Sequence, residues 1–211
     1  MIPKITITLV ALVRMFLFGP AKFVPSNPRR IAVAQMGRLG DMVCTTPVFR
    51  ALKEKYPECE VVVGGMSGNA EILNNYPNVD RYYSYTGNAW KLAGFLKELN
   101  LDAAILCGPH GLVLAAMLVA GIPLVSVPVI IGGDSPYETR IYKLLRHFGL
   151  NKPHNMLKYA PREYLRLLEP FGIHTEDTRK ELAYSFEVWQ KVKSKAIEAG
   201  INLGTDVCIG I

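Results

Sequence analysis

The sequence lacks several features that would assign it to a class directly. Its cysteines lie too far apart for a CxxC metal or redox motif, and three of them sit in apolar stretches, which favours a reducing, cytosolic setting; they are Cys44, Cys59, Cys107 and Cys208. No apolar run reaches the roughly 20 residues that a membrane-spanning helix needs. His147 and His154 have no cysteine or acid at metal-ligand spacing, so no metal is expected.

Two common nucleotide-binding signatures are also missing. The first glycine-containing loop, "MGRLGD" (36–41), matches neither GxGxxG nor the P-loop, which disfavours an ordinary nucleotide-binding oxidoreductase domain. The basic segments contain no helix-turn-helix or RNA-binding motif, and their aromatic residues do not alternate with Lys and Arg on a strand. Nucleic-acid binding is therefore disfavoured.

What the sequence contains is typical of a globular protein with an acidic partner. Half of its 211 residues are hydrophobic and 20% are charged, with a net charge of +6 and a pI near 9.1. Residues 1–30 hold five basic residues and no acid. Residues 139–166 hold seven basic residues against Glu163 alone, and this second run is either a solvated helix face or a binding face.

The apolar stretch "ITITLVALVRMFLFG" (5–19) has three interpretations. A signal peptide is disfavoured because no cleavage site of small residues follows. An in-plane helix at a membrane surface would bury Phe16, Leu17 and Phe18 and place its basic residues at anionic headgroups. A plain helix packed on the domain is the alternative. "GPAKFVPSNPRR" (19–30) then reads as a linker.

From residue 30 onward, strand and helix patterns alternate with short joints. Such repetition predicts an α/β fold, a doubly wound and mostly parallel sheet. The expected strands are 30–36, 58–66, 80–85, 101–108 and 122–133. The expected helices are 41–56, a short one at 69–77, 88–100 capped by Asn88, and 110–121 ended by Gly121.

The pattern changes after residue 134. Two helices, 135–150 and 160–173, are expected with a basic loop between them. A short strand at 182–186, a helix at 188–201 and a strand at 205–211 should follow. The chain stops just as this last strand begins, which suggests a fragment of a two-domain protein unless that strand pairs with the sheet.

Asp41 lies where the first strand hands over to a helix. Ligands of open parallel sheets bind beyond the carboxyl ends of the strands, and Gly37 and Gly40 permit close approach there. The carboxylate has two candidate roles, as helix N-cap or as a general base that takes a proton from a sugar hydroxyl. Thr45 and Thr46 either bond a polar ligand or bond their own backbone.

Further candidates line the same edge or carry positive charge. Arg38 is either solvated or meets a phosphate or carboxylate on a substrate. His110, at the end of the fourth strand, is either a helix-start residue or part of the site. The i, i+3 spacing of Arg140, Lys143 and Arg146 forms one basic helix face that would steer an anionic substrate.

The segment "RRIAVAQMGRLGDMVCTTPVFRALKEKYPECEVVVGGMSGNAEILNNYPNVDRYYSY" resembles the start of glycosyltransferase family 9, the ADP-heptose:lipopolysaccharide heptosyltransferases. "YAPREYLRLLEPFGI" (159–173) is a second, weaker match. The resemblance covers residues 29–211. It implies two facing Rossmann-like domains, the GT-B arrangement, with metal-free inverting transfer. The family's proposed base is the aspartate after the first strand, which is Asp41 here.

The resemblance also implies how this chain is divided. Residues 1–28 would be an apolar, basic helix and linker, 29–187 the acceptor-side domain, and 188–211 a junction helix and the first strand of a truncated donor domain. The nucleotide-sugar donor, ADP-heptose in the family, would be bound by the missing domain, and no further cofactor is expected. The chain alone should therefore lack turnover. The acceptor would be a glycolipid held by Arg38, Gly40, Thr45, Thr46, His110, Arg140, Lys143 and Arg146.

The implied location is cytoplasmic and peripheral, on the inner face of the cell membrane, with residues 1–24 on an anionic surface. The competing hypothesis is a non-catalytic module, derived from such an enzyme, that holds a glycolipid or docks to a partner. Whether a second α/β domain follows would distinguish the two.

Overall fold

A computed structural model describes residues 2–19 and 26–202. Its strands are β1 (Arg30–Gln35), β2 (Glu60–Gly65), β3 (Arg81–Ser84), β4 (Ala103–Leu106), β5 (Val125–Gly132) and β6 (Leu150–Asn155). Its α-helices are α1 (Ile2–Phe18), α2 (Leu39–Lys55), α3 (Ala89–Glu98), α4 (Gly111–Ala120), α5 (Arg140–Leu145), α6 (Ala160–Leu165) and α7 (Phe186–Glu198). Three 3₁₀ helices are η1 (Ser67–Leu73), η2 (Arg146–Phe148) and η3 (Arg166–Phe171).

The strands form one six-stranded sheet in the order β3-β2-β1-β4-β5-β6, and every pairing is parallel. The predicted α/β, doubly wound class is therefore confirmed. The chain builds outward from β1 to β3, then returns to add β4 on the other side of β1. The topological switch point consequently lies between β1 and β4, where ligands of such sheets bind beyond the carboxyl ends.

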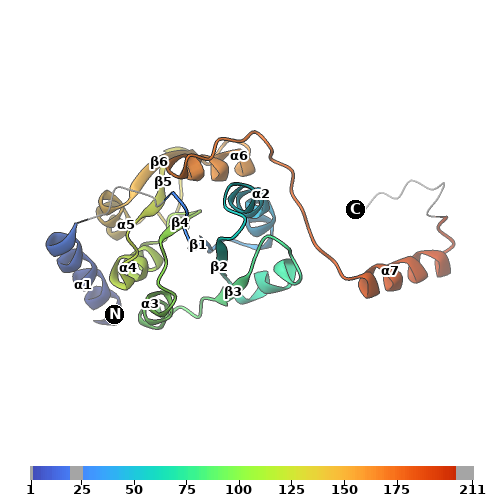
Figure 1. The fold of residues 1–211 in the computed structure, drawn as a ribbon, viewed down its shortest axis with the longest axis horizontal. Coiled ribbons are helices and arrows are strands. Elements are labelled where there is room, and N and C mark those ends of the chain that lie inside the picture. The colour runs from blue at the N-terminus through green and yellow to red at the C-terminus, as the bar shows by residue number, and fades with distance from the viewer. Residues whose placement is uncertain (1, 20–25, 203–211) are drawn as a thin grey trace.

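Helices cover both faces of the sheet (Figure 1). One core lies under α1, α3, α4 and α5, and the other under α2, η1, α6 and η3. The central strands β1 and β4 are apolar and almost wholly buried because both of their faces meet helices. The loops after β1 and β4 are thereby held at fixed positions at the carboxyl edge of the sheet. Asp41 and His110 lie at the starts of the helices that follow these loops.

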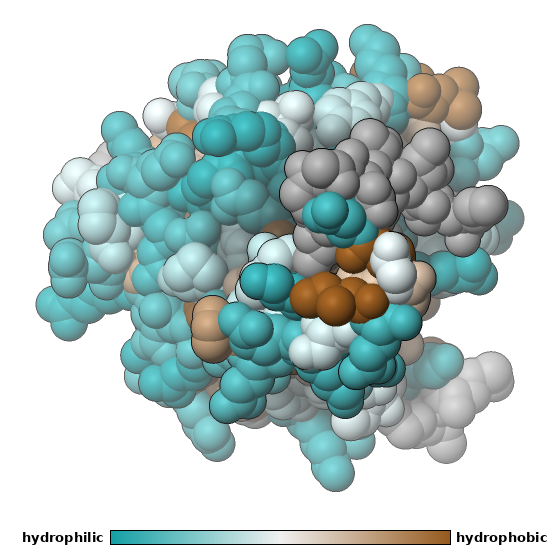
Figure 2. Space-filling view, turned by 90° about the vertical axis from the view of Figure 1, so that its right-hand side faces the viewer, coloured by the Kyte–Doolittle hydropathy of each residue, from teal (hydrophilic) through white to brown (hydrophobic). Residues whose placement is uncertain are grey.

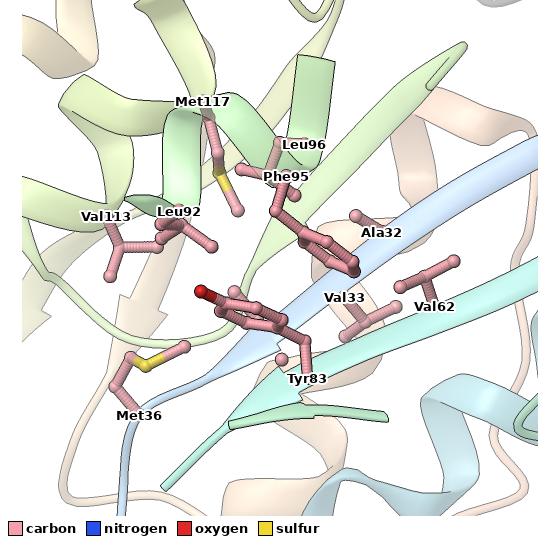
Figure 3. Close-up of a pocket in the computed structure, with 12 residues that line it drawn as sticks. Ala32, Val33, Met36, Val62, Tyr83, Leu92, Phe95, Leu96, Val113 and Met117 are labelled. Carbon is pink, nitrogen blue, oxygen red and sulfur yellow. The ribbon is translucent and has the colours of Figure 1, made fainter. Parts of the chain in front are cut away.

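A small cavity of about 20 Å³ lies in the first core, between the sheet and helices α3 and α4 (Figure 3). Met36 and Met117 point into it from opposite sides, and the rings of Tyr83 and Phe95 stack with centroids 4.2 Å apart. Its walls are almost entirely apolar, so no ordered water is expected inside. It is a packing defect and not a ligand site.

The helix ends follow the predicted local rules. Asn88 caps α3, and its side-chain oxygen accepts hydrogen bonds from the backbone N–H groups of Trp90 and Lys91, each 3.1 Å long. Gly121 ends α4 in the left-handed conformation at φ 81°. The Arg14 guanidinium rests against this glycine, so a side chain here would have to displace that guanidinium.

Three expected elements differ in the structure. The basic loop between the last two helices of the domain is in fact the edge strand β6, which its sequence LNKPHN conceals because it is mostly polar and contains Pro153. The short helix at 69–77 is the 3₁₀ helix η1. Residues 182–185 form no strand, because the preceding segment is fastened to α2 and not to a sheet edge. The strand expected at 205–211 lies outside the described residues.

Helix α1 packs on α4 through one face only. Ile7, Ala11 and Met15 are buried in the first core, as expected from the alternative interpretation of a helix packed on the domain. The opposite face stays apolar and exposed, up to 88% for Phe16 and 65% for Leu17. Over the described residues, the structure has no helix that is both long and apolar enough to cross a bilayer.

Helix α7 stands apart from the sheet, at the end of an extended segment that runs from residue 174 to 185 (Figure 1). Within the described part of the chain, none of the side chains of α7 is buried, although Phe186, Trp189 and Val192 are apolar. Seen from the α7 end, the molecule is mostly hydrophilic with one compact hydrophobic patch (Figure 2).

Candidate functional site

The loop between β1 and α2 brings Asp41 back toward its own beginning. Arg38 occupies the N-cap position of α2, and Asp41 is the third residue of the helix, so Asp41 is not itself the N-cap. A side chain at Gly37 would place its Cβ 2.6 Å from the Asp41 Cβ. Glycine is therefore required at position 37 for the carboxylate to lie where it does.

The two carboxylate oxygens of Asp41 face different neighbours. Oδ2 accepts a 2.8 Å hydrogen bond from the backbone N–H of Arg38, which is one half of a capping box. The Tyr164 hydroxyl lies 3.5 Å from Oδ1, a long hydrogen bond that leaves room on this oxygen. The side chain is half-buried, so the helix-start role and a chemical role coexist in this geometry.

Tyr164 and His154 form a layer behind the carboxylate that the sequence did not single out. Both are buried, and their rings stack with centroids 5.5 Å apart. Burial, assisted by the Asp41 charge, raises the pKa of Tyr164 well above its usual range, so the hydroxyl keeps its proton. Burial lowers the pKa of His154, although the nearby Glu163 carboxylate opposes this, and the His154 Nδ1 has no partner among the described residues.

Thr45 and Thr46 are fully buried and hydrogen-bonded inside the protein. The Thr45 hydroxyl donates to the Asp41 carbonyl at 2.8 Å and accepts from Gln35 Nε2 at 3.0 Å. The Thr46 hydroxyl donates to the Val43 carbonyl at 2.8 Å. The structure favours the second role weighed for them, bonding within the protein, and removes both as residues that touch an acceptor.

His110 is the N-cap of α4, and its Nδ1 accepts a 3.3 Å hydrogen bond from the Val113 N–H. Burial lowers the pKa of His110, which keeps the imidazole neutral and able to accept. The ring also meets the edge of Tyr85 at a centroid distance of 5.7 Å. His110 lies beyond the carboxyl end of β4, the neighbour of the strand that leads to Asp41.

The predicted basic face is divided by one acid. Glu138 pairs with Lys143 at 3.4 Å and with Arg146 at 2.7 Å, so two of the three positive charges on the predicted basic face are already compensated. Arg140 is exposed, and none of the described carboxylates forms an ion pair with it. Arg38 and Gly40 are exposed beside Asp41, and the space in front of Gly40 is open.

Two polar residues that hold the loop, Gln35 of β1 and Asn69 of η1, escaped the sequence-based prediction. Gln35 Oε1 accepts from the Gly37 N–H at 3.0 Å, and Asn69 Nδ2 donates to the Gly37 carbonyl at 3.0 Å. Together they fix the loop that carries Asp41. A signal for Gln35 was present, because it is a polar residue at the carboxyl end of β1, directly after the apolar residues 31–34.

No metal-binding cluster of three or more His, Cys, Asp or Glu side chains occurs within residues 2–19 and 26–202. Cys59 and Cys107 are buried free thiols, and burial raises the pKa of Cys59 to about 11. These two cysteines are therefore core residues and not nucleophiles. Cys208 lies outside the described residues.

Comparison with solved structures identifies relatives of this fold. A family 9 glycosyltransferase from Veillonella parvula superposes with a TM-score of 0.64 at 18% identity, over 89% of this chain and 53% of that one. This chain shares the fold of family 9 glycosyltransferases. The resemblance predicted from the first βα unit is thus confirmed at the level of structure.

Two Escherichia coli enzymes agree with this assignment. ADP-heptose lipopolysaccharide heptosyltransferase II gives a TM-score of 0.55 at 16% identity, over 82% of this chain and 51% of that one. Heptosyltransferase WaaC with ADP gives 0.58 at 13% identity, over 82% and 65%. The present chain spans about half to two thirds of the length of these proteins. No protein-family model and no curated protein matches its sequence.

Proposed function

We propose that the chain is the acceptor-side part of a glycosyltransferase that moves a heptose or related sugar from a nucleotide-sugar donor to a lipopolysaccharide-type glycolipid. The observation that carries this proposal is a half-buried carboxylate, Asp41, at the switch point of a parallel sheet whose fold is that of family 9 enzymes. The donor, ADP-heptose in this proposal, would be held by a second domain facing the same edge.

The local geometry supports a base role for Asp41. An acceptor hydroxyl seated in front of Oδ1 would transfer its proton to that oxygen as it attacks the anomeric carbon of the donor with inversion, while the bond from that carbon to the phosphate oxygen breaks and the nucleoside diphosphate leaves. Tyr164, held protonated by burial, would keep the carboxylate oriented. Exclusion of water between two closed domains and alignment of the reactants would supply much of the rate.

Transfer itself tests the proposal. A chain extended by a second Rossmann-like domain is expected to add one heptose to a heptose-free lipopolysaccharide core, seen as the corresponding mass increase, while the 211-residue chain is expected to give no product. Acceptor binding by the 211-residue chain, combined with no transfer by the extended one, would favour the competing hypothesis of a non-catalytic module.

The exposed side of α1 supports a peripheral position on the inner, cytoplasmic membrane face as part of the same proposal. Phe16 and Leu17 project from a helix whose segment, residues 1–30, carries five basic residues and no acid. Removing the helix would uncover α4, so point substitution is the cleaner test.

Phe16→Ser with Leu17→Ser is expected to abolish flotation with vesicles of anionic phospholipid and to leave the melting temperature nearly unchanged, because both side chains are already exposed. Leu157→Ser, at an exposed apolar residue shortly before α6, serves as the control. Equal recovery of all proteins in the soluble fraction would contradict the membrane position.

A further inference from the structure

Two open hollows adjoin one another on the α1 side of the sheet's carboxyl edge. One, of about 620 Å³, is lined by residues 86–90 after β3, and the other, of about 250 Å³, by the segments after β4 and β5. Lys4 and Leu112 line both, so the two hollows adjoin at these side chains and are treated together as one groove. We name it the Lys4 groove.

The walls of the Lys4 groove are amphipathic. The smaller hollow is mostly apolar, with Leu112, Tyr137 and Ile141 among its lining residues. Trp90 stands at the other end and is 40% exposed. The exposed apolar face of α1 starts nearby, with Ile5 half-exposed directly after Lys4. An alkyl chain fits such a wall, whereas a free sugar would leave most of it uncovered.

The charges at this groove are unbalanced. Lys4 and Arg140 are exposed, and no ion pair joins either of them to a carboxylate of the described residues. The nearest acid along the chain, Glu138, is already engaged by Lys143 and Arg146. An anionic headgroup in the groove would therefore meet Lys4, which lines both hollows, while Arg140 lies between the lining residues Thr139 and Ile141 along the chain.

A buried hydroxyl lies beside the groove. The Tyr85 Oη has no hydrogen-bond partner among the described residues, and its ring meets His110, which lines the smaller hollow. A buried hydroxyl without a partner is costly, and a water bound at this hydroxyl would relieve it.

We propose that the Lys4 groove binds a single-chain anionic amphiphile, with its alkyl chain against Leu112, Tyr137 and Ile141 and its phosphate at Lys4. This rests on the proposed function in one respect: Asp41 follows β1, and His110 in the groove wall follows the neighbouring strand β4, so the groove would hold the lipid-proximal part of the acceptor. Binding itself requires no donor domain.

Direct titration tests the groove separately from transfer. Trp189→Phe leaves Trp90 as the sole tryptophan, a reporter in the groove wall. In this background, dodecyl phosphate below its micelle concentration is expected to change the Trp90 fluorescence saturably. Inorganic phosphate and dodecyl maltoside are expected to bind at least about 10-fold more weakly, since each offers only one half of the recognised chemistry.

Substitutions separate the contribution of the charged headgroup contact from that of the apolar wall. Lys4→Gln is expected to weaken dodecyl phosphate binding about 5- to 20-fold without affecting dodecyl maltoside, because it removes one charge-assisted contact. Ile141→Ser is expected to weaken both ligands. Lys158→Gln and Leu157→Ser, at exposed positions outside the groove, should change neither.

If dodecyl maltoside bound as tightly as dodecyl phosphate, recognition of an anionic headgroup would be contradicted. If inorganic phosphate bound as tightly as dodecyl phosphate, recognition of the alkyl chain would be contradicted. Absence of any saturable response would overturn the site. Because Asp41 takes no part in this titration, a failed transfer experiment leaves its result intact, and a failed titration leaves the assignment of Asp41 intact.

Discussion

Asp41→Asn, in a chain that carries a donor domain, is expected to lower kcat about 10²–10⁴-fold, the usual contribution of a positioned general base. Asparagine keeps an oxygen that can accept from the Arg38 N–H, so the loop should retain its shape. It cannot take a proton from an attacking hydroxyl. Since the acceptor's other contacts persist, KM should change far less than kcat.

The structural cost of Asp41→Asn should be small. Loss of one charge from the first turn of a helix typically costs about 0.3–1 kcal/mol. Asp134→Asn, at an exposed carboxylate, is the matched control and should change neither rate nor stability. Steady-state rates with both variants, together with urea unfolding, make the comparison. Unchanged turnover in Asp41→Asn would remove the base assignment.

Arg50→Met is expected to lower the free energy of unfolding by about 2–3 kcal/mol, more than any other substitution proposed for this chain. The Arg50 guanidinium is buried, donates to the Arg179 carbonyl at 3.0 Å and lies 2.6 Å from Glu181 Oε1. Hydrogen bonds made by a charged group contribute roughly 1.5–3 kcal/mol each, and methionine retains the apolar stem while losing them all. Urea unfolding measures this loss.

The same change should release the segment that leads to α7. Arg50 ties residues 177–181 to α2, so its loss is expected to speed tryptic cleavage at Arg179 and Lys180. Arg162→Met is the control, because it removes an ion pair to Glu176 in which both side chains are largely exposed, worth about 0.5 kcal/mol or less. Equal cleavage of both variants would contradict a fastening role for Arg50.

The parts of the fold that the sequence predicts are those whose signal is local. Buried parallel strands such as β1 are continuous apolar runs, and Asn88 and Gly121 mark helix ends by their own chemistry. Strand β6 escaped because an edge strand needs no apolar run and tolerates Pro153. Residues 182–185 were misjudged because the contact of Arg50 with Glu181 spans more than a hundred residues.

The candidate site divides in the same way. Asp41 and His110 were predictable because parallel topology sends both to one sheet edge, whichever helices follow. Tyr164 was not, because its role depends on where α6 lies on α2, and no motif in its own segment marks it. The fate of Thr45 and Thr46 turned on burial, which a local pattern leaves open.

The Asp41 carboxylate receives one contact from its own loop and the other from a residue 123 positions further along the chain. During synthesis the first contact is available early, whereas the second waits until α6 has emerged and settled. Shortened chains that stop before Tyr164 would therefore retain Asp41, but its Oδ1 would lack the contact with the Tyr164 hydroxyl. Folding of the chain as far as α6, rather than of its first βα unit, sets when the carboxylate acquires its final orientation.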